Sequence, residues 1–110
     1  MRFVHYTYPD STSRTPHFEV NAFLDDGTWL GHYPRRGGWL ENVFVAPDQR
    51  SKGVCALLVR HAINRKRGLR LHVRDTNTAA RRCYTRAGFQ PVSNHNGMIV
   101  MKHVSDIQPK

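Results

Sequence analysis

Apolar and aromatic residues in the first half of the chain gather in short stretches separated by turn-forming residues, a pattern typical of β-strands. Residues 3–8 are a candidate strand, and residues 18–24 and 29–33 are two more. Asp25-Asp26-Gly27 lies between the last two and supplies a positive-φ turn that favours a hairpin. This half of the chain therefore predicts antiparallel strands.

The strongest strand pattern spans residues 39–45, and Ala46-Pro47 ends it. Successive side chains of a strand point to opposite faces. The two faces would carry Glu41, Val43 and Val45 on one side and Asn42 and Phe44 on the other. Trp29, Tyr33 and Trp39 are assigned to the core, with a groove or a dimer contact as the alternative.

In the second half, apolar residues at three- and four-residue spacing predict a helix over residues 53–67, which Gly68 ends. A loop over residues 48–52 precedes this helix, and a short strand over residues 69–73 follows it. The predicted buried stripe of the helix is Val54, Leu57, Leu58 and Ala62.

A second helix is predicted over residues 77–87, with Asp75 or Thr76 as its N-cap. Residues 89–92 and 98–104 then form an antiparallel pair around a polar turn. One face of this helix carries Ala80, Cys83, Tyr84 and Ala87. The order of elements predicts a mixed α/β (α+β) domain with at least one parallel crossover.

The 110 residues fit one domain, with a short N-terminal segment (1–17), a core (18–104) and a tail (105–110). The apolar run 54–59 is far shorter than the ~18 residues of a membrane span. The first twenty residues hold no stretch resembling a signal peptide. We therefore expect a cytoplasmic protein without a membrane partner, with Cys55 and Cys83 as reduced thiols.

Candidate chemistry begins with the loop Arg50-Ser51-Lys52-Gly53-Val54-Cys55, between a strand and a helix. A helix start offers free backbone N–H groups and partial positive charge, and a glycine there lets a phosphate approach closely. An ordinary solvated turn is the alternative, because such junctions are common.

A second segment, residues 77–89, has the pattern N-x-x-A-x-x-x-Y-x-x-x-G-F. Here the sequence resembles the GNAT superfamily of acetyl-CoA-dependent N-acetyltransferases, and the Arg50–Cys55 loop resembles that family's [QR]-x-x-G-x-[GA] pyrophosphate motif. The two motifs come in the family's order, separated by a strand, and the resemblance covers residues 18–104. It implies a mostly antiparallel sheet with a splayed parallel strand pair and two main helices.

The resemblance also implies roles for individual residues. Acetyl-CoA would enter between the splayed strands, and backbone groups around Phe44 and Val45 would pair with its pantetheine arm. Amides of the loop would hold the pyrophosphate: Arg50, Ser51, Lys52, Gly53, Val54 and Cys55. Asn77 would hydrogen-bond the cofactor, and Tyr84 would protonate the leaving thiolate, since a phenol keeps its proton at neutral pH. For Tyr84, a core tyrosine on an apolar helix face is the alternative.

Glu41 is the candidate general base for the acceptor amine, directly or through water. Its position resembles that of a strand glutamate in histone-acetylating members of the superfamily. A surface carboxylate at a strand edge is the alternative. His72 is a possible accessory base or a packed strand histidine. The seven histidines show no zinc-like spacing with the cysteines, so no metal is expected.

Two departures from the family stand out. Cys55 takes a position where the family has Gly or Ala, so it either remodels the loop or packs into the helix. The family's first strand and two helices have little room ahead of residue 18; at most a vestige of that strand fits, and the helices are missing. This predicts an open acceptor groove, or one completed by a second subunit.

The chain carries 17 Lys+Arg against 8 Asp+Glu, a formal net charge of +9. This excess suggests docking to an anionic partner, such as nucleic acid, a ribosome or an acidic protein. We therefore carry two functions. The first is acetyl transfer from acetyl-CoA to a lysine or N-terminus of a protein, in the manner of short phage or mobile-element members that modify a host target. The second is a non-catalytic binding module on the same scaffold.

Overall fold

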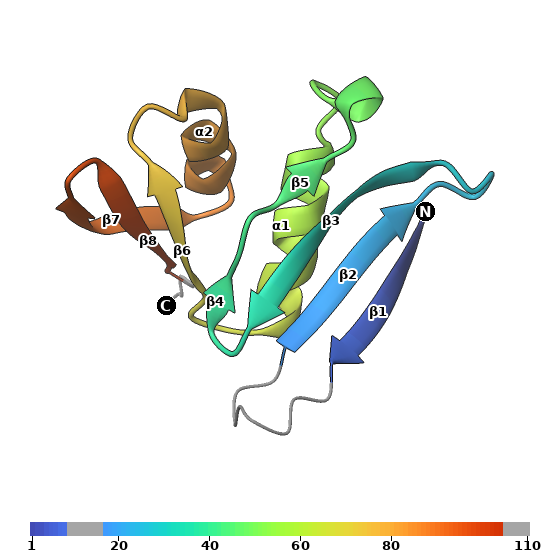
Figure 1. The fold of residues 1–110 in the computed structure, drawn as a ribbon, viewed down its shortest axis with the longest axis horizontal. Coiled ribbons are helices and arrows are strands. Elements are labelled where there is room, and N and C mark those ends of the chain that lie inside the picture. Colours follow the sequence, from blue (N-terminus) through green and yellow to red (C-terminus); the bar gives the residue numbers. More distant parts are fainter. Residues whose placement is uncertain (9–16, 105–110) are drawn as a thin grey trace, which may run out of the picture.

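The computed structural model describes residues 1–8 and 17–104. A mixed sheet carries two α-helices and one short 3₁₀ helix (Figure 1). In chain order the elements are β1 (Arg2–Tyr8), β2 (His17–Phe23), β3 (Trp29–Arg36), β4 (Trp39–Leu40), β5 (Phe44–Val45), η1 (Pro47–Gln49), α1 (Val54–Arg65), β6 (Arg70–Arg74), α2 (Thr78–Arg86), β7 (Phe89–His95) and β8 (Met98–His103).

The strands lie in the order β1-β2-β3-β4-β6-β8-β7, and β5 pairs with β3 off this path. All neighbours are antiparallel except β4 and β6, which are parallel with Trp39 opposite Arg70. The predicted fold class, a mostly antiparallel sheet with one splayed parallel pair and two helices, is confirmed.

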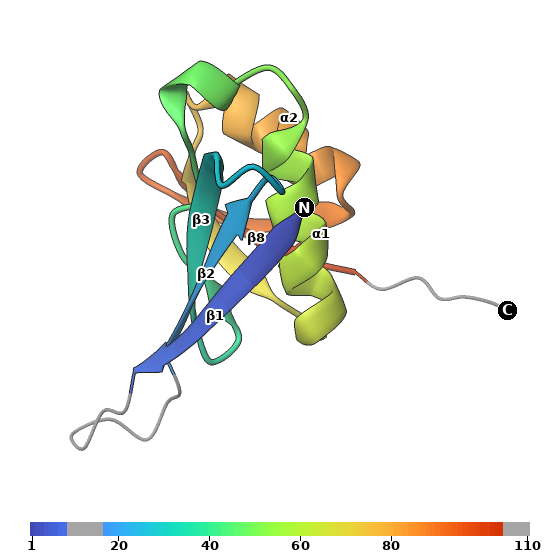
Figure 2. The same cartoon turned by 90° about the vertical axis from the view of Figure 1, so that its right-hand side faces the viewer.

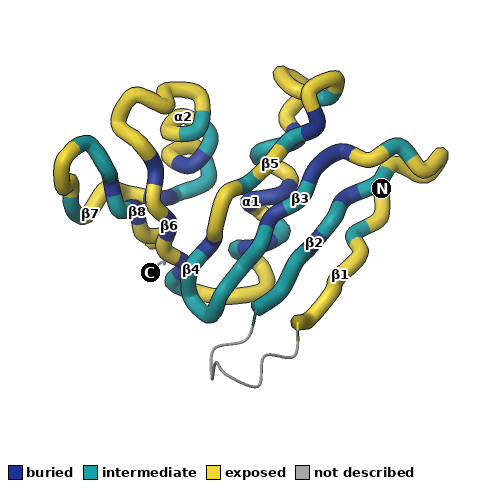
Figure 3. The backbone as a smooth tube through the Cα atoms, viewed as in Figure 1, coloured by how far each residue is buried: buried dark blue, intermediate teal, exposed yellow. Residues whose placement is uncertain are grey.

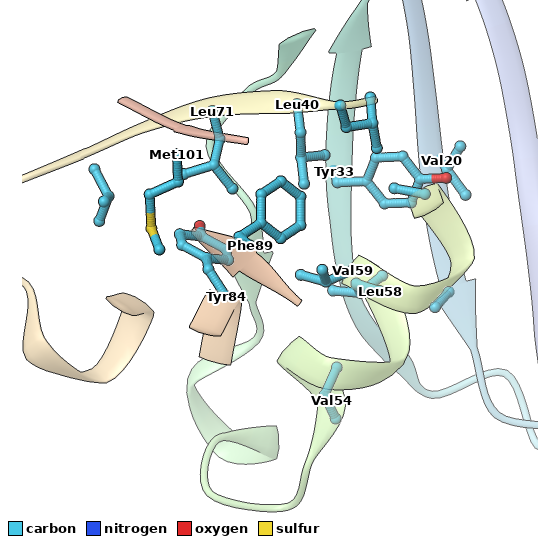
Figure 4. Packing of buried hydrophobic residues seen from close by; sticks show 14 of the residues in the cluster. Val20, Tyr33, Leu40, Val54, Leu58, Val59, Leu71, Tyr84, Phe89 and Met101 are labelled. Atoms are coloured by element: carbon cyan, nitrogen blue, oxygen red, sulfur yellow. The ribbon is translucent and has the colours of Figure 1, made fainter. Parts of the chain in front are cut away.

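Both helices pack on the sheet through a single apolar core. Buried side chains of α1, of α2 and of the strands point toward one another around Phe89 and Leu58 (Figure 4). Figure 2 shows α1 lying against β1, β2 and β3. In α1 the buried residues are Val54, Leu58, Val59 and Ala62. The prediction for Leu57 was wrong: it is exposed, because the stripe runs through Val59 instead.

The predicted strand 39–45 is broken. Residues 41–43 are not extended in a ladder, and only β4 and β5 remain as strands. The cause is tertiary, because β4 pairs with both β3 and β6, whereas β5 pairs with β3 alone. The chain therefore moves away from β6 in residues 41–43, between β4 and β5. At the break, the Glu41 backbone N–H donates to the Pro34 carbonyl at 2.9 Å.

The cap of α2 also differs from the prediction. The side-chain oxygen of Asn77 accepts a hydrogen bond from the Ala80 N–H at 3.3 Å, so Asn77 is the N-cap rather than Asp75 or Thr76. The helix begins at Thr78, and a capping side chain must stand directly before the first helical residue. The Ala80, Cys83, Tyr84, Ala87 face does pack into the core, as predicted.

The candidate strand over residues 3–8 is confirmed, and it is longer than the vestige that the comparison with the family implied. Instead of a vestige, β1 is a seven-residue strand in register with β2 over its whole length, Arg2 to Tyr8. It is an edge strand and mostly exposed (Figure 3). The prediction of missing helices between β1 and β2 falls on residues 9–16, outside the described residues.

The expectation of reduced cysteines is contradicted. Cys55 in the first turn of α1 and Cys83 in α2 form a disulfide, with their Cα atoms 6.5 Å apart. The two lie 28 residues apart, and the crossover through β6 brings both helices to the same side of the sheet. The spacing of the two cysteines along the chain does not predict that they lie close together. Neither helix of the described segments is long and apolar enough to cross a membrane.

Candidate functional site

The candidate site lies where β4 and β5 part from β6. After Trp39 pairs with Arg70 and the Arg70 N–H donates to the Gly38 carbonyl at 2.8 Å, the two strands diverge (Figure 1). A cavity of about 410 Å³ opens there. Its lining residues are Arg36, Trp39, Leu40, Glu41, Asn42 and His72.

One wall of this cavity is aromatic. The rings of Trp39 and His72 are stacked, with centroids 4.7 Å apart and planes 7° from parallel. The stack spans from β4 to β6 and closes the base of the divergence. Trp39 therefore lines a groove rather than the core, whereas Tyr33 is buried as predicted.

Glu41 is exposed at the strand break and contributes the cavity's one carboxylate. Its backbone N–H is held by the hydrogen bond to the Pro34 carbonyl. Sequence reasoning named Glu41 and His72 and missed Arg36. The signal for Arg36 was its place at the end of β3 beside the Gly37-Gly38 turn, which brings it next to the start of β4.

Beyond the cavity, β5 carries the backbone groups assigned to the pantetheine arm. The Ala46 N–H donates to the Leu30 carbonyl on β3, so the Val45 carbonyl, on the opposite side of the same peptide unit, points away from β3. In this structure the Val45 carbonyl accepts from Nε of Arg50 at 3.2 Å, and the Arg50 guanidinium lies 5.7 Å from the Phe44 ring centroid. A pantetheine arm that pairs with Val45 would displace Arg50.

The loop from Arg50 to Cys55 ends at an uncapped helix start. Ser51 and Gly53 have φ of +64° and +80°, and no side chain caps α1. The first amides of a helix have no carbonyl partner within it, and α1 has no acidic residue in its first turn. Nothing lies within 4 Å of a Cβ placed on Gly53, so the approach is open. These are the features of an anion site.

The α2 residues flank this loop. The Cys55–Cys83 disulfide fastens α2 to the first turn of α1, and Tyr84 is the next residue. Tyr84 is buried beside Phe89, with ring centroids 6.0 Å apart, and burial raises the pKa of its phenol (Figure 4). Its proton is therefore retained at neutral pH. Asn77 uses its carbonyl oxygen as the cap, which leaves its NH₂ group for a ligand.

Positive charge gathers on the outer face of α2, around an open cavity of about 380 Å³. Arg81 donates from Nη1 to the Asp75 carbonyl at 2.9 Å, which holds its guanidinium at the start of the helix. The lining residues are Thr78, Arg81, Arg82, Thr85 and Arg86. Within residues 1–8 and 17–104, no three metal-binding side chains cluster.

Comparison with known proteins finds a matching family model and a curated relative. The model of the acetyltransferase (GNAT) family matches residues 6–89. The peptidyl-lysine N-acetyltransferase YjaB of Salmonella typhimurium is 32% identical over 69 residues, which cover 63% of this chain and 48% of YjaB. The chain thus spans about half the length of this curated relative.

Solved structures share the fold, and two of them serve as examples. A variant of the spermidine N-acetyltransferase SpeG from Vibrio cholerae superposes with a TM-score of 0.68 and 17% identity, over 80% of this chain and 65% of SpeG. The PaiA N-acetyltransferase of Thermoplasma acidophilum, solved with coenzyme A, superposes with a TM-score of 0.63 and 17% identity. The match covers 79% of this chain and 58% of PaiA.

Proposed function

The chain belongs to the acetyltransferase (GNAT) family, and from that membership we propose that it moves an acetyl group from acetyl-CoA to an amine, on a lysine or an N-terminus of a protein. The observation that carries the proposal is the uncapped, open start of α1 beside the divergence of β4–β5 from β6. An anion site and a strand-lined gap at one place suit a cofactor with a pyrophosphate and an extended arm.

The residues of the loop fit the cofactor. The free amides at Val54 and Cys55 would hold its pyrophosphate, and Arg50 and Lys52 would add positive charge. Gly53 leaves room for the phosphate oxygens because it has no Cβ. Ser51, Phe44 and Val45 would contribute backbone groups, and the Asn77 amide a further hydrogen bond. Bound acetyl-CoA supplies a thioester carbon open to attack by an amine.

Two side chains would then move protons. The carboxylate of Glu41 takes a proton from the acceptor ammonium in the cavity, so that the neutral amine can attack. The phenol of Tyr84, kept protonated by burial, gives its proton to the departing sulfur. Trp39 and His72 form the wall along which the alkyl chain of the acceptor lies.

A protein acceptor is favoured over a polyamine by charge. The lining of the cavity includes Arg36 as well as its single carboxylate, and the chain as a whole carries +9, which repels a free polycation such as the spermidine of SpeG. The name of YjaB, a peptidyl-lysine acetyltransferase, points the same way. We propose that the reaction takes place in the cytoplasm, at an acceptor groove that is either open or completed by a second copy of the chain.

The test is a Tyr84→Phe variant, with Tyr33→Phe as the matched loss of a buried phenol outside the site. Calorimetry follows acetyl-CoA binding, and mass spectrometry follows transfer to lysine peptides. We expect Tyr84→Phe to bind acetyl-CoA normally and to lose about 10- to 100-fold in kcat. Transfer at the wild-type rate would remove Tyr84 from the mechanism.

The base is tested with Glu41→Gln. The control is the double change Glu41→Gln with Asn42→Asp, which keeps one carboxylate in the cavity but moves it to the neighbouring position. Loss of the base should lower kcat at saturating acceptor. A wild-type kcat in Glu41→Gln would mean that water or His72 takes the proton instead.

The basic face of α2 supports a second candidate, a module that binds nucleic acid or an acidic protein. Steep salt dependence of nucleic-acid binding, lost in Arg82→Gln, together with no affinity for acetyl-CoA, would favour that function over catalysis.

A further inference from the structure

A second cavity, of about 310 Å³, lies between the strands β1–β3 and the last turns of α1. Its lining includes His5, Tyr33, Arg35, Asn64 and Arg65. It shares no lining residue with the cavity at Glu41. The loop with the open amides is at the opposite end of α1, about 18 Å away at 1.5 Å per residue over the helix's 12 residues.

The charge on this cavity is of one sign. Arg35 and Arg65 both line it, and none of its lining residues within the described segments carries a carboxylate. The ion pairs formed among the described residues join Met1 to Asp25 and His32 to Glu19, and neither arginine takes part. The carbonyl end of α1 offers only about half a negative charge, less than the two guanidinium charges.

The pKa shifts around the cavity arise first from burial, with a smaller contribution from the Arg65 charge. Burial and then the nearby Arg65 charge lower the pKa of His5. Burial lowers the pKa of Arg35; the neighbouring Tyr33 works against this shift and Arg65 adds to it. Each neighbour of Arg65 thus binds its proton less readily, and a bound anion would reverse that effect.

The walls are held in place before any ligand arrives. Nη1 of Arg35 donates to the Gly37 carbonyl at 2.8 Å, and its guanidinium lies 4.4 Å from the centroid of the Phe18 ring. The Tyr33 hydroxyl is hydrogen-bonded to Nδ1 of His61 at 2.7 Å. Fixed cationic and aromatic groups lose little entropy on binding.

From these observations we propose that this cavity is a second ligand site, which binds a small organic anion with a phosphate or carboxylate group on a planar apolar body. Arg65, Arg35 and the Asn64 amide bind the charged group, and Phe18 with Val20 covers the body. The volume admits a ligand of about the size of one aromatic ring, at the low end of known ligand pockets.

The probes are phenyl phosphate and benzoate, with inorganic phosphate as the anion lacking a body. Titrations are followed by NMR on the full chain, saturated with coenzyme A so that the loop at Gly53 is not available. Shifts in the Asn64 side-chain amide and in the His5 ring, with a rise in the pKa of His5, report binding in this cavity. A lower dissociation constant for phenyl phosphate or for benzoate tells which charged group the site prefers.

Arg65→Gln is the test variant, and Arg60→Gln removes a cation from the exposed side of the same helix. We expect Arg65→Gln to weaken the preferred probe at least 10-fold and Arg60→Gln less than 2-fold. Equal weakening in both variants would mean nonspecific attraction to a basic protein and would overturn the proposal. Shifts confined to other residues, or inorganic phosphate binding as tightly as both organic probes, would overturn it too. None of these readouts depends on acetyl transfer.

Discussion

The two halves of the sheet are built differently. The N-terminal half, β1–β5 with α1, begins its helix at Gly53 without a side-chain cap, whereas the C-terminal half, β6–β8 with α2, begins its helix under the Asn77 cap. The halves meet along the sheet at one parallel residue pair, Trp39 and Arg70, and across the helices at Cys55–Cys83. One helix start is left free for a ligand and the other is satisfied by its own chain.

The difference shows which backbone amides are available to bind a ligand and which are already used to stabilise the fold. No side chain caps the first amides of α1, so they remain available to an anion, while Asn77 already satisfies an amide of α2 and so stabilises the fold itself. The disulfide then couples the two, since it holds the open helix start against the helix that carries Tyr84. Four changes test this contrast.

The largest effect should come from separating the helices. For a bridge that closes 28 residues, the change Cys55→Ser with Cys83→Ser should lower the free energy of unfolding by about 3 to 4 kcal/mol, through the entropy of the unfolded chain. Urea titrations measure it. Dithiothreitol should destabilise the wild type equally and the double variant not at all; an insensitive wild type would show that the bond does not hold the halves together.

Next comes the open helix start. Gly53→Asp places a negative charge at the amides of α1 and should weaken acetyl-CoA at least 30-fold, or about 2 kcal/mol, in calorimetry. Gly27→Asp is the matched control, because Gly27 also has a positive φ of +93° and open space around it, and it lies in the β2–β3 hairpin rather than in the loop. Equal losses in both variants would point to backbone strain rather than to the site.

A histidine of the N-terminal half, His61, should make the folded protein less stable at acid pH. Burial, with the charges of His5 and Arg65, lowers the pKa of His61 to about 4, and Phe3 stacks on its ring. The unfolded chain therefore takes up the proton first, so stability is full above about pH 6.5 and falls as the pH drops toward 4.

The loss should be about 1 to 2 kcal/mol once solvent screening of this partly exposed ring is allowed for. Thermal unfolding in chloride buffer between pH 7 and pH 4 measures it. His61→Gln should flatten the profile, and His95→Gln, at an exposed position of the C-terminal half, should leave it unchanged. A slope that survives His61→Gln would assign the sensitivity elsewhere.

The smallest effect is expected from removing the side-chain cap of α2, which abolishes the difference between the two helix starts. Asn77→Ala removes the cap of α2 and should cost about 1 kcal/mol of unfolding free energy, whereas Asn77→Gly, which makes α2 begin as α1 does, should cost a few tenths. Hydrogen exchange at the Ala80 amide should increase in both. An unchanged Ala80 exchange rate would mean that the side chain does not cap the helix in solution.

Sequence alone determined the features that depend on neighbours along the chain. The Asp25-Asp26-Gly27 turn, the start of α1 after Gly53 and the apolar face of α2 follow from local backbone freedom and from periodic burial, so they were predicted correctly. The two motifs also led to the family. The catalytic roles of Glu41 and Tyr84 remain predictions, since their positions are known and their chemistry is not.

Tertiary structure decided whatever depends on residues distant in sequence. The strand breaks at residues 41–43 because β5 has β3 but not β6 beside it, and Cys83 meets Cys55 because a crossover lays two helices together. The cluster of His5, Arg35 and Arg65 forms only when β1, β3 and the end of α1 converge. Hydrophobic periodicity fixes which face of an element is buried, but not which other element packs against it, and these three sites depend on that second choice.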